Sequence, residues 1–271
     1  MNEEIYSELL AAMNSREPVV LATVTDTHRS VPRRPGSKML IYADGHTSGT
    51  IGGGEMEARV RDEAAEVLAE GRPRRISYGL VDPSAGDPGV CGGEVELYLE
   101  PHMPQSTVFV IGLGHVGKAV IELAKWLGHR VIGWDDRSEL AAEAESMVDG
   151  AVVLSGDLAD VVSRHPIDDQ TRVVMATRHT GIDTELLPIL LATPAPYIGL
   201  MGSTRRWANT RGKLTEAGLS EEQLDRVVSP IGIEIAAETP AEIAVSILAQ
   251  VINNERADRS LGRDVHAPAE A

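Results

Sequence analysis

The fold is decided by the stretch Thr107-Val108-Phe109-Val110-Ile111-Gly112-Leu113-Gly114-His115-Val116-Gly117. The apolar segment ending at Ile111 predicts a buried strand, and the glycines after it have the G-x-G-x-x-G spacing of a dinucleotide-binding turn. Gly112 permits the tight turn, Gly114 lets the backbone approach a pyrophosphate, and Gly117 allows close packing of helix on strand. Helix N–H groups at such a turn favour an anion, so we expect these three glycines to bind a cofactor.

A possible ribose contact follows the next predicted strand. That strand, residues 130–134, is followed by Asp135, 23 residues after Gly112, where an acidic residue accepts a hydrogen bond from a ribose hydroxyl. Arg137 lies two residues further on and leaves open the choice between phosphorylated and unphosphorylated ribose. A fold of this kind also occurs with another ligand in its pocket, or none.

The second part of the chain alternates apolar strands with amphipathic helices, which predicts a right-handed parallel sheet. The expected strands are 107–111, 130–134, 151–154, 172–176 and 197–200, and a last helix covers 240–252. The fold class is therefore α/β, with a doubly wound parallel-sheet Rossmann domain over residues 104–254 and a polar tail over 255–271.

Polar side chains follow two of these strands, at the sheet edge where open α/β sheets bind ligands. His179 and Asp183 come after the strand 172–176. His179 is either a general base or a hydrogen-bonded loop histidine. Ser203, after the strand 197–200, either binds phosphate together with an arginine or caps a helix while the arginines are solvated.

Residues 1–103 predict a separate, mixed α+β domain. The expected helices are 6–14 and 55–70, and the expected strands are 18–24, 38–43, 47–51, 75–80 and 94–100. Gly52, Gly53 and Gly54 lie at a strand-to-helix junction, where bare N–H groups at the positive helix end favour an anion. Arg33 could add a bidentate anion contact. The alternatives are a simple tight turn and, for Glu57, compensation of the helix dipole.

Cys91 is the single cysteine, which excludes an internal disulfide or a cysteine-cluster metal site, and we expect no metal ligands. It precedes Gly92 and Gly93 in a loop rich in proline and glycine, where a ligand can approach closely. Cys91 and His179 are therefore the candidate catalytic residues, and a purely structural cysteine is the alternative.

The composition excludes several classes of partner. The 41 acidic residues against 25 basic ones give a net charge of −16, which disfavours binding to a phosphate backbone. Aromatic residues, at 3%, are too few for the stacking platforms of RNA-binding sheets. The start of the chain lacks signal-peptide character, and prolines interrupt the longest uncharged run, 186–204. We expect a soluble cytoplasmic protein without nucleic-acid or membrane partners.

Taken together, these motifs resemble the xanthine dehydrogenase accessory protein family, of the XdhC/CoxI type. The matching text covers nearly the whole chain in order: Pro32-Arg33-x-x-Gly36-x-x-Met39, Gly49-Thr50-Ile51-Gly52-Gly53-Gly54-x-x-Glu57, Cys91-Gly92-Gly93, Leu99-Glu100-Pro101, the glycine fingerprint, Tyr197-Ile198-Gly199-x-x-Gly202-Ser203, Pro230-Ile231-Gly232 and Thr239-Pro240-x-Glu242-Ile243-Ala244. The chain departs from the family pattern at three positions. Glu55 stands where many members have cysteine, and Arg29 and Ala236 stand where glycine is common.

The resemblance implies an accessory factor, or chaperone, with an XdhC-type domain before its Rossmann domain. Such a factor binds molybdenum cofactor (molybdopterin), supports its sulfuration and delivers it to a molybdenum hydroxylase such as xanthine dehydrogenase. Expected partners are that client, a cysteine desulfurase and a second copy of the chain. The candidate cofactor-binding residues are Arg33, Gly52, Gly53, Gly54, Glu57, Cys91, Gly112, Gly114, Gly117, Asp135 and Ser203.

Two other functions remain open, together with the question of catalysis. One is an NAD(P)-dependent oxidoreductase, for which only His179 and Asp183 suit hydride transfer. The other is a dinucleotide-sensing module that regulates a partner enzyme. We favour a non-catalytic accessory protein, and we expect the glycine run, Cys91 and the Rossmann edge to serve one shared site.

Overall fold

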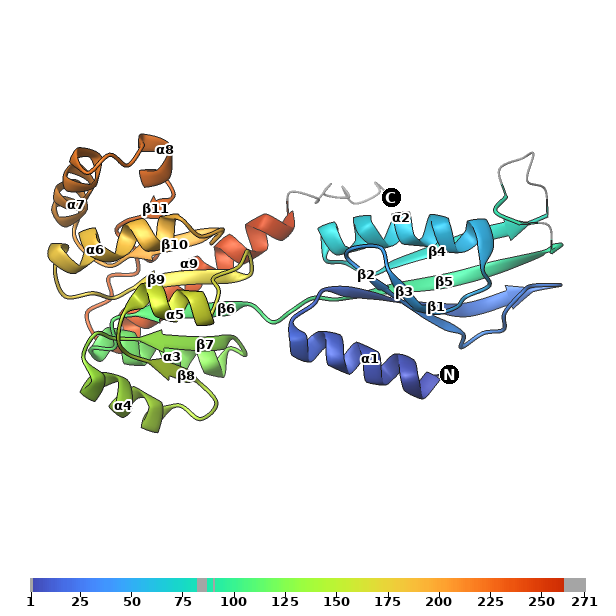
Figure 1. The fold of residues 1–271 in the computed structure, drawn as a ribbon, viewed down its shortest axis with the longest axis horizontal. Helices are drawn as coiled ribbons and strands as arrows, with labels where there is room; N and C mark the ends of the chain where they lie inside the picture. The colour runs from blue at the N-terminus through green and yellow to red at the C-terminus, as the bar shows by residue number, and fades with distance from the viewer. Residues whose placement is uncertain (1, 82–86, 90, 261–271) are drawn as a thin grey trace, which may run out of the picture. The chain divides into compact units, whose positions relative to one another are not determined.

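The computed structural model describes residues 2–81, 87–89 and 91–260, which form two compact units (Figure 1). The first unit runs to Pro104, and the second begins at Gln105. Each unit has its own hydrophobic core on both faces of its own sheet. The chain is therefore a mixed α/β protein with an antiparallel sheet in its first unit and a parallel Rossmann sheet in its second.

The first unit is a five-stranded antiparallel sheet with one helix on each face (Figure 1). Its elements are α1 (Asn2–Ser15), β1 (Val19–His28), β2 (Lys38–Tyr42), β3 (Thr47–Gly49), α2 (Gly54–Glu70), β4 (Arg74–Leu80) and β5 (Gly93–His102). The strand order is β3-β2-β1-β5-β4. Every second residue of β5 is buried, as in a strand with one face on a core. Met56, Val60 and Val67 of α2 cover one face of the sheet, and Ile5 and Leu9 of α1 cover the other.

The second unit is a six-stranded parallel sheet with the strand order β11-β10-β9-β6-β7-β8. The strands are β6 (Thr107–Ile111), β7 (Arg130–Trp134), β8 (Val152–Leu154), β9 (Thr171–Met175), β10 (Tyr197–Leu200) and β11 (Val227–Val228). The chain winds outward from β6 to β8 and then returns to the other side of β6 with β9. This is the Rossmann order, whose switch point between β6 and β9 is a ligand-binding crevice in open α/β sheets.

Helices cover both faces of the parallel sheet. They are α3 (His115–Trp126), α4 (Ser138–Met147), α5 (Leu158–Arg164), α6 (Thr180–Leu191), α7 (Thr204–Glu216), α8 (Glu221–Leu224) and α9 (Pro240–Ser260). One core contains residues of α3, α4 and α9, and the other contains residues of α5 to α8. The parallel sheet thus lies between two apolar layers, which fix the positions of the loops at the carboxyl ends of its strands.

Several elements differ from the sequence-based expectation, and α1, for example, begins at Asn2 rather than at residue 6. The last helix, expected over 240–252, continues to Ser260, and its packing residues Ile247, Leu248 and Val251 all lie within the expected part. Strand β11 was not expected, since two residues carry no periodic signal. Strand β1 extends to His28 through a bulge between Val24 and Asp26. None of the described helices is both long and apolar enough to cross a bilayer.

Candidate functional site

The three glycines of the fingerprint have different roles in the second unit. A Cβ on Gly112 would lie 2.6 Å from the Ala176 carbonyl oxygen, and one on Gly117 would lie 1.8 Å from the Gly112 oxygen. A Cβ on Gly114 would meet no described atom within 4 Å. The first and third glycines therefore serve the packing of β6, β9 and α3. The second leaves open space in front of the helix.

The N-terminus of α3 lies at this open space. Gly114 is its N-cap, with no side-chain capping bond, and no acidic residue lies in the first turn. The N–H groups of the first turn therefore carry their positive partial charge without a carboxylate from the helix itself. This is the arrangement that the sequence predicts for a phosphate-facing turn.

Asp135, the expected ribose contact, is occupied by the protein's own groups. Its Oδ2 accepts from the Leu113 N–H (2.7 Å) and from Nη2 of Arg137 (2.9 Å). Its Oδ1 accepts from the backbone N–H (2.9 Å) and Nε (2.8 Å) of Arg137. Only 1% of Asp135 is exposed. The hydrogen bond to Asp135 raises the pKa of the Arg137 guanidinium.

A second ion pair lies beside the first. Both terminal nitrogens of Arg178 bind the carboxylate of Asp136, at 2.7 Å each. This hydrogen bonding lowers the pKa of Asp136 to about 2. The sequence did not single out Asp136 or Arg178 as a pair, although residues that follow parallel strands of one sheet, here β7 and β9 on either side of β6, lie at the same edge.

Asp183 forms a buried ion pair at the carboxyl end of β9. Nη2 and Nε of Arg206 bind its two carboxylate oxygens at 2.8 Å each, and the Thr177 hydroxyl also donates to it. Arg206 further donates to the Thr177 carbonyl oxygen at 3.0 Å. Asp183 is fully buried. The arginine that we expected to bind phosphate or to be solvated therefore joins two loops of the sheet edge.

His179 and Ser203 both cap helices. A ring nitrogen of His179 accepts from the Ile182 N–H at 3.4 Å, at the start of α6. The hydroxyl of Ser203 accepts from the Arg206 N–H at 3.2 Å, at the start of α7. These contacts are the structural alternatives that the sequence left open for each residue.

In the first unit, the glycine run surrounds the carboxylate of Glu57. Oε1 accepts from the Thr50 hydroxyl (2.6 Å) and from the N–H groups of Ile51 (3.1 Å), Gly52 (3.3 Å) and Gly53 (2.9 Å). Burial alone would raise the pKa of Glu57, but these four donors outweigh it and lower the pKa below the ordinary value. The glycine run therefore forms an anion-binding turn, and the carboxylate of Glu57 occupies it.

The loop that carries Arg33 packs on this turn. Ring atoms of Pro32 and the methyl end of Met56 fill the space that a side chain on Gly52 would need. Arg33 itself is exposed. A contact between its guanidinium and an anion at the glycine run stays a prediction.

Cys91 is an exposed free thiol just before β5. Beside it lies a pocket of about 470 Å³ lined by His28, Arg29, Val81, Gly92, Gly93 and Glu94. A Cβ on Gly93 would lie 2.3 Å from the Ser30 carbonyl oxygen, so this glycine is needed for the close approach of the two loops. Arg29 has φ of +61°, in the left-handed region that favours glycine.

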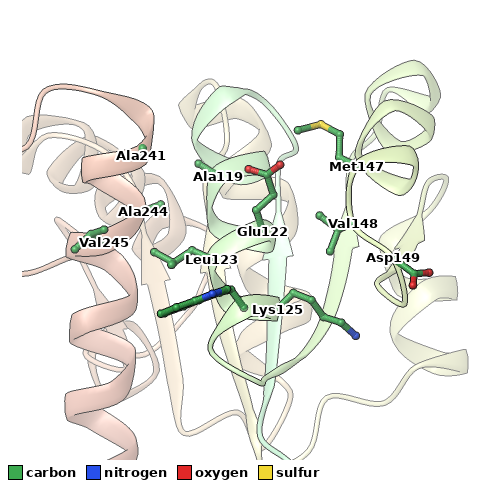
Figure 2. A pocket seen from close by; sticks show the side chains of 11 residues that line it. Ala119, Glu122, Leu123, Lys125, Met147, Val148, Asp149, Ala241, Ala244 and Val245 are labelled. Atoms are coloured by element: carbon green, nitrogen blue, oxygen red, sulfur yellow. The ribbon is translucent and has the colours of Figure 1, made fainter.

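A larger hollow of about 630 Å³ lies on the helical face formed by α3, the end of α4 and the start of α9 (Figure 2). Figure 2 shows Leu123, Val245 and Met147 along its walls. Trp126 also lines it and is 81% exposed. None of the predicted site residues lines this hollow. In the sequence, this hollow is indicated by Trp126, a tryptophan in the last turn of the amphipathic helix α3.

The described residues contain no group of three or more histidine, cysteine, aspartate or glutamate side chains that could hold a metal ion. The predicted residues fall into two groups. Gly112, Gly114, Gly117, Asp135, His179 and Ser203 lie in the second unit, and Arg33, Gly52, Gly53, Gly54, Glu57 and Cys91 lie in the first. That both groups serve one site stays a prediction.

Comparison with known proteins covers both units. Residues 108–251 match the XdhC Rossmann domain, and residues 12–79 match the XdhC and CoxI family. YqeB of Escherichia coli K12 is 31% identical over 253 residues, which are 92% of this chain and 46% of that protein. The chain thus spans about half the length of this relative.

Two further proteins extend the comparison. The molybdenum cofactor insertion chaperone PaoD of Escherichia coli K12 is 24% identical over 269 residues, 89% of this chain and 84% of PaoD. A crystal structure from Bacillus halodurans, described as a xanthine dehydrogenase, is 23% identical, covers 96% of this chain and 97% of its own, and has a TM-score of 0.49. The family matches, which take in both the glycine run and the fingerprint, establish that the chain belongs to the XdhC and CoxI family.

Proposed function

We propose that the chain is a chaperone that binds molybdenum cofactor, supports its sulfuration and inserts it into a molybdenum hydroxylase of the xanthine dehydrogenase type. The observation that carries the proposal is the likeness to PaoD, a molybdenum cofactor insertion chaperone, along 89% of the chain. A probable xanthine dehydrogenase component of Bacillus subtilis is 26% identical over 165 residues, and this likeness supports a client of that type.

The chemistry of the cargo agrees with the groups that the chain offers. Molybdenum cofactor carries a phosphate and a metal–dithiolene centre. In the second unit, the α3 N-terminus at Gly114 is a positive group suited to a phosphate. In the first unit, the exposed Arg33 is another, and the Cys91 thiol is a sulfur nucleophile. Contacts of Gly52 to Gly54 and Ser203 with the cofactor stay predictions, because the Gly52 and Gly53 N–H groups bind Glu57 and the Ser203 hydroxyl caps α7.

Glu57 and Asp135 have a supporting role in this proposal. Both carboxylates accept backbone N–H groups of a glycine loop, Glu57 in the first unit and Asp135 in the second. We assign to them the ordering of these loops, so that the loops meet the cofactor in a fixed conformation.

The oxidoreductase alternative has less support. It needs a side chain for hydride transfer, and Asp183 is fully buried in its ion pair with Arg206. His179 caps α6. The Rossmann fold by itself still suggests a nucleotide ligand.

Retention of the cargo tests the proposal. Purified chain is mixed with cofactor released from a denatured molybdenum enzyme and passed over a gel-filtration column, and molybdenum and pterin are measured in the protein peak. We expect stoichiometric retention, and faster activation of a cofactor-free hydroxylase than free cofactor gives. Absence of both effects would contradict the proposal.

Sulfur transfer is tested separately through Cys91. After incubation with a cysteine desulfurase and cysteine, we expect the intact mass of the wild-type chain to rise by one sulfur atom. Cys91→Ser and Cys91→Ala should stay unmodified with unchanged thermal unfolding, because the exposed thiol packs on little. Equal activation of the hydroxylase by these variants would remove Cys91 from the proposal and leave cofactor retention standing.

We also propose that the chain forms a homodimer through the hollow of Figure 2, since twofold dimers are the commonest oligomers. The exposed Trp126 supplies an apolar anchor. Glu122 and Lys125 border the same surface.

A further inference from the structure

The carboxylate of Asp135 has no acceptor position left for a ligand. A carboxylate has about four lone-pair sites, two on each oxygen. On Asp135 these are matched by four donors: the Leu113 N–H and Nη2 of Arg137 on Oδ2, and the N–H and Nε of Arg137 on Oδ1. All four distances lie between 2.7 and 2.9 Å.

This occupancy bears directly on NAD, the ligand that the fingerprint suggests. In dinucleotide-binding Rossmann domains, the acidic residue at this position accepts a hydrogen bond from the adenosine ribose. Here a ribose hydroxyl would have to replace one arm of the Arg137 guanidinium. The residues present at this edge therefore do not fit the ribose of NAD(H).

Arg137 has a strong reason to stay on Asp135. The other carboxylate near it is Asp136, 3.8 Å from Nε, and both Arg178 nitrogens already bind that carboxylate. Asp135 is almost fully buried, so loss of Arg137 would leave a buried charge short of donors. Displacement of Arg137 by a neutral hydroxyl would exchange two charge-assisted hydrogen bonds for weaker ones.

We propose that Arg137 is the specificity-determining residue of this Rossmann edge: it withholds Asp135 from the ribose diol, so that the domain rejects NAD(H). The ligands expected at this edge are then those that bind without donating ribose hydroxyl groups to Asp135. Of the four donors, the Leu113 and Arg137 N–H groups belong to the backbone and order the glycine loop. The Arg137 side chain supplies the other two.

The proposal predicts a gain of binding on substitution. In Arg137→Ala, the two backbone donors remain, and one lone pair becomes free on each oxygen of Asp135. Two acceptors on adjacent oxygens suit the two hydroxyls of a ribose. Arg137 is 36% exposed, so its removal opens the carboxylate to solvent and ligand.

Titration calorimetry with NAD⁺ on the full chain tests this. We expect wild type to bind with Kd of about 1 mM or weaker, and Arg137→Ala to bind about ten- to hundredfold more tightly, the effect of a hydrogen bond to a charged group. Arg137→Met, which keeps the aliphatic stem, should gain similarly. Arg205→Ala is the control, because it removes an exposed arginine at the start of α7 and leaves both the Arg137–Asp135 and the Arg178–Asp136 pairs in place, and it should gain nothing.

Two results would overturn the proposal. One is tight NAD⁺ binding by wild type that is lost in Asp135→Asn, since Asp135 would then read the ribose with Arg137 in place. The other is a folded Arg137→Ala or Arg137→Met variant, checked by circular dichroism, that binds NAD⁺ no better than wild type. If neither variant folds, the wild-type and Asp135→Asn titrations still decide whether Asp135 reads the ribose.

Discussion

Arg206 and Asp183 form a two-point ion pair in which the carboxylate is fully buried and both donor distances are 2.8 Å. The same guanidinium binds the Thr177 carbonyl oxygen. One side chain from the start of α7 thereby joins the loop after β9 to the loop after β10. These are the two loops at which the sequence places His179 and Ser203.

Removal of Arg206 should be strongly destabilising. Arg206→Ala leaves Asp183 charged and buried without its partner, at a cost of about 3–5 kcal/mol in the free energy of unfolding. Arg205→Ala is the matched control: Arg205 is exposed in the same turn, and its loss should cost within about 0.5 kcal/mol. Urea denaturation measures both. Similar unfolding midpoints for the two variants would show that the pair contributes little.

The Glu57 contacts should make the first unit sensitive to acid. The folded-state pKa of Glu57 is lowered, so its stabilisation is complete above the unfolded-state value of about 4.5. It is lost as the pH falls through the folded-state value. Glu57→Gln should therefore be less stable than wild type by about 1–3 kcal/mol at pH 7, and the difference should shrink below about pH 4.5.

Glu55→Gln is the control for this comparison. Glu55 lies in the same helical turn, but it is exposed and pairs with the side chain of Arg59 four residues later. Its substitution should change stability by less than about 0.5 kcal/mol. Thermal unfolding of both variants from pH 3 to pH 7 separates them. A constant Glu57→Gln deficit across that range would contradict the carboxylate's role.

Of the three described non-glycine residues with positive φ, Arg16, Arg29 and Ala236, the last two have backbone conformations that glycine would relieve at positions where the family has it. Arg29 and Ala236 have φ of +61° and +54°, at the positions where the family commonly has glycine. Ala236→Gly and Arg29→Gly should each raise the free energy of unfolding by about 0.5–1 kcal/mol. Ala237→Gly, at the residue after Ala236, should instead lower the free energy of unfolding by a similar amount. Differential scanning calorimetry distinguishes the signs, and destabilisation by Ala236→Gly would refute the assignment.

The two glycines at the start of α3 should respond in opposite ways. Gly114→Ala should leave stability within about 0.5 kcal/mol, because a Cβ meets no described atom within 4 Å there and φ is −70°. Gly117→Ala drives a Cβ into the Gly112 carbonyl and should cost about 3 kcal/mol or more, or prevent folding. Gly114→Val should fold but weaken binding of a phosphate-bearing ligand. Equal thermal stability of Gly114→Ala and Gly117→Ala would disprove the division of roles.

The dimer proposal depends on Trp126. Trp126→Ser removes the most exposed large apolar side chain of the hollow in Figure 2, and we expect it to shift the molar mass from dimer to monomer in light scattering. Leu10→Ser, at an exposed leucine of α1, is the control and should leave the mass unchanged. A wild-type chain that stays monomeric at high concentration would rule the dimer out.

Much of the fold could be predicted because apolar runs and glycine turns are local signals. Strands β6, β7 and β10 have the expected bounds. The contacts within the candidate site were harder to predict, because its residues bind partners that lie far away in the chain. Asp135 binds Leu113, 22 residues earlier, and Arg206 binds Asp183, 23 residues earlier. Sequence spacing brings such groups to one sheet edge, but it does not tell which donor each carboxylate takes.

Glu57 is the partial exception. A carboxylate one turn into a helix, after a run of glycines, lies within reach of the loop N–H groups, as in a capping box. The sequence offered this role as helix-dipole compensation beside a cofactor contact. The structure adds that one oxygen, Oε1, receives all four donors.

The outermost strands of the parallel sheet, β8 and β11, have only three and two residues. A short edge strand presents few unpaired backbone groups and gives an incoming chain little to align with. The sheet therefore ends abruptly on both sides, which resists edge-to-edge aggregation.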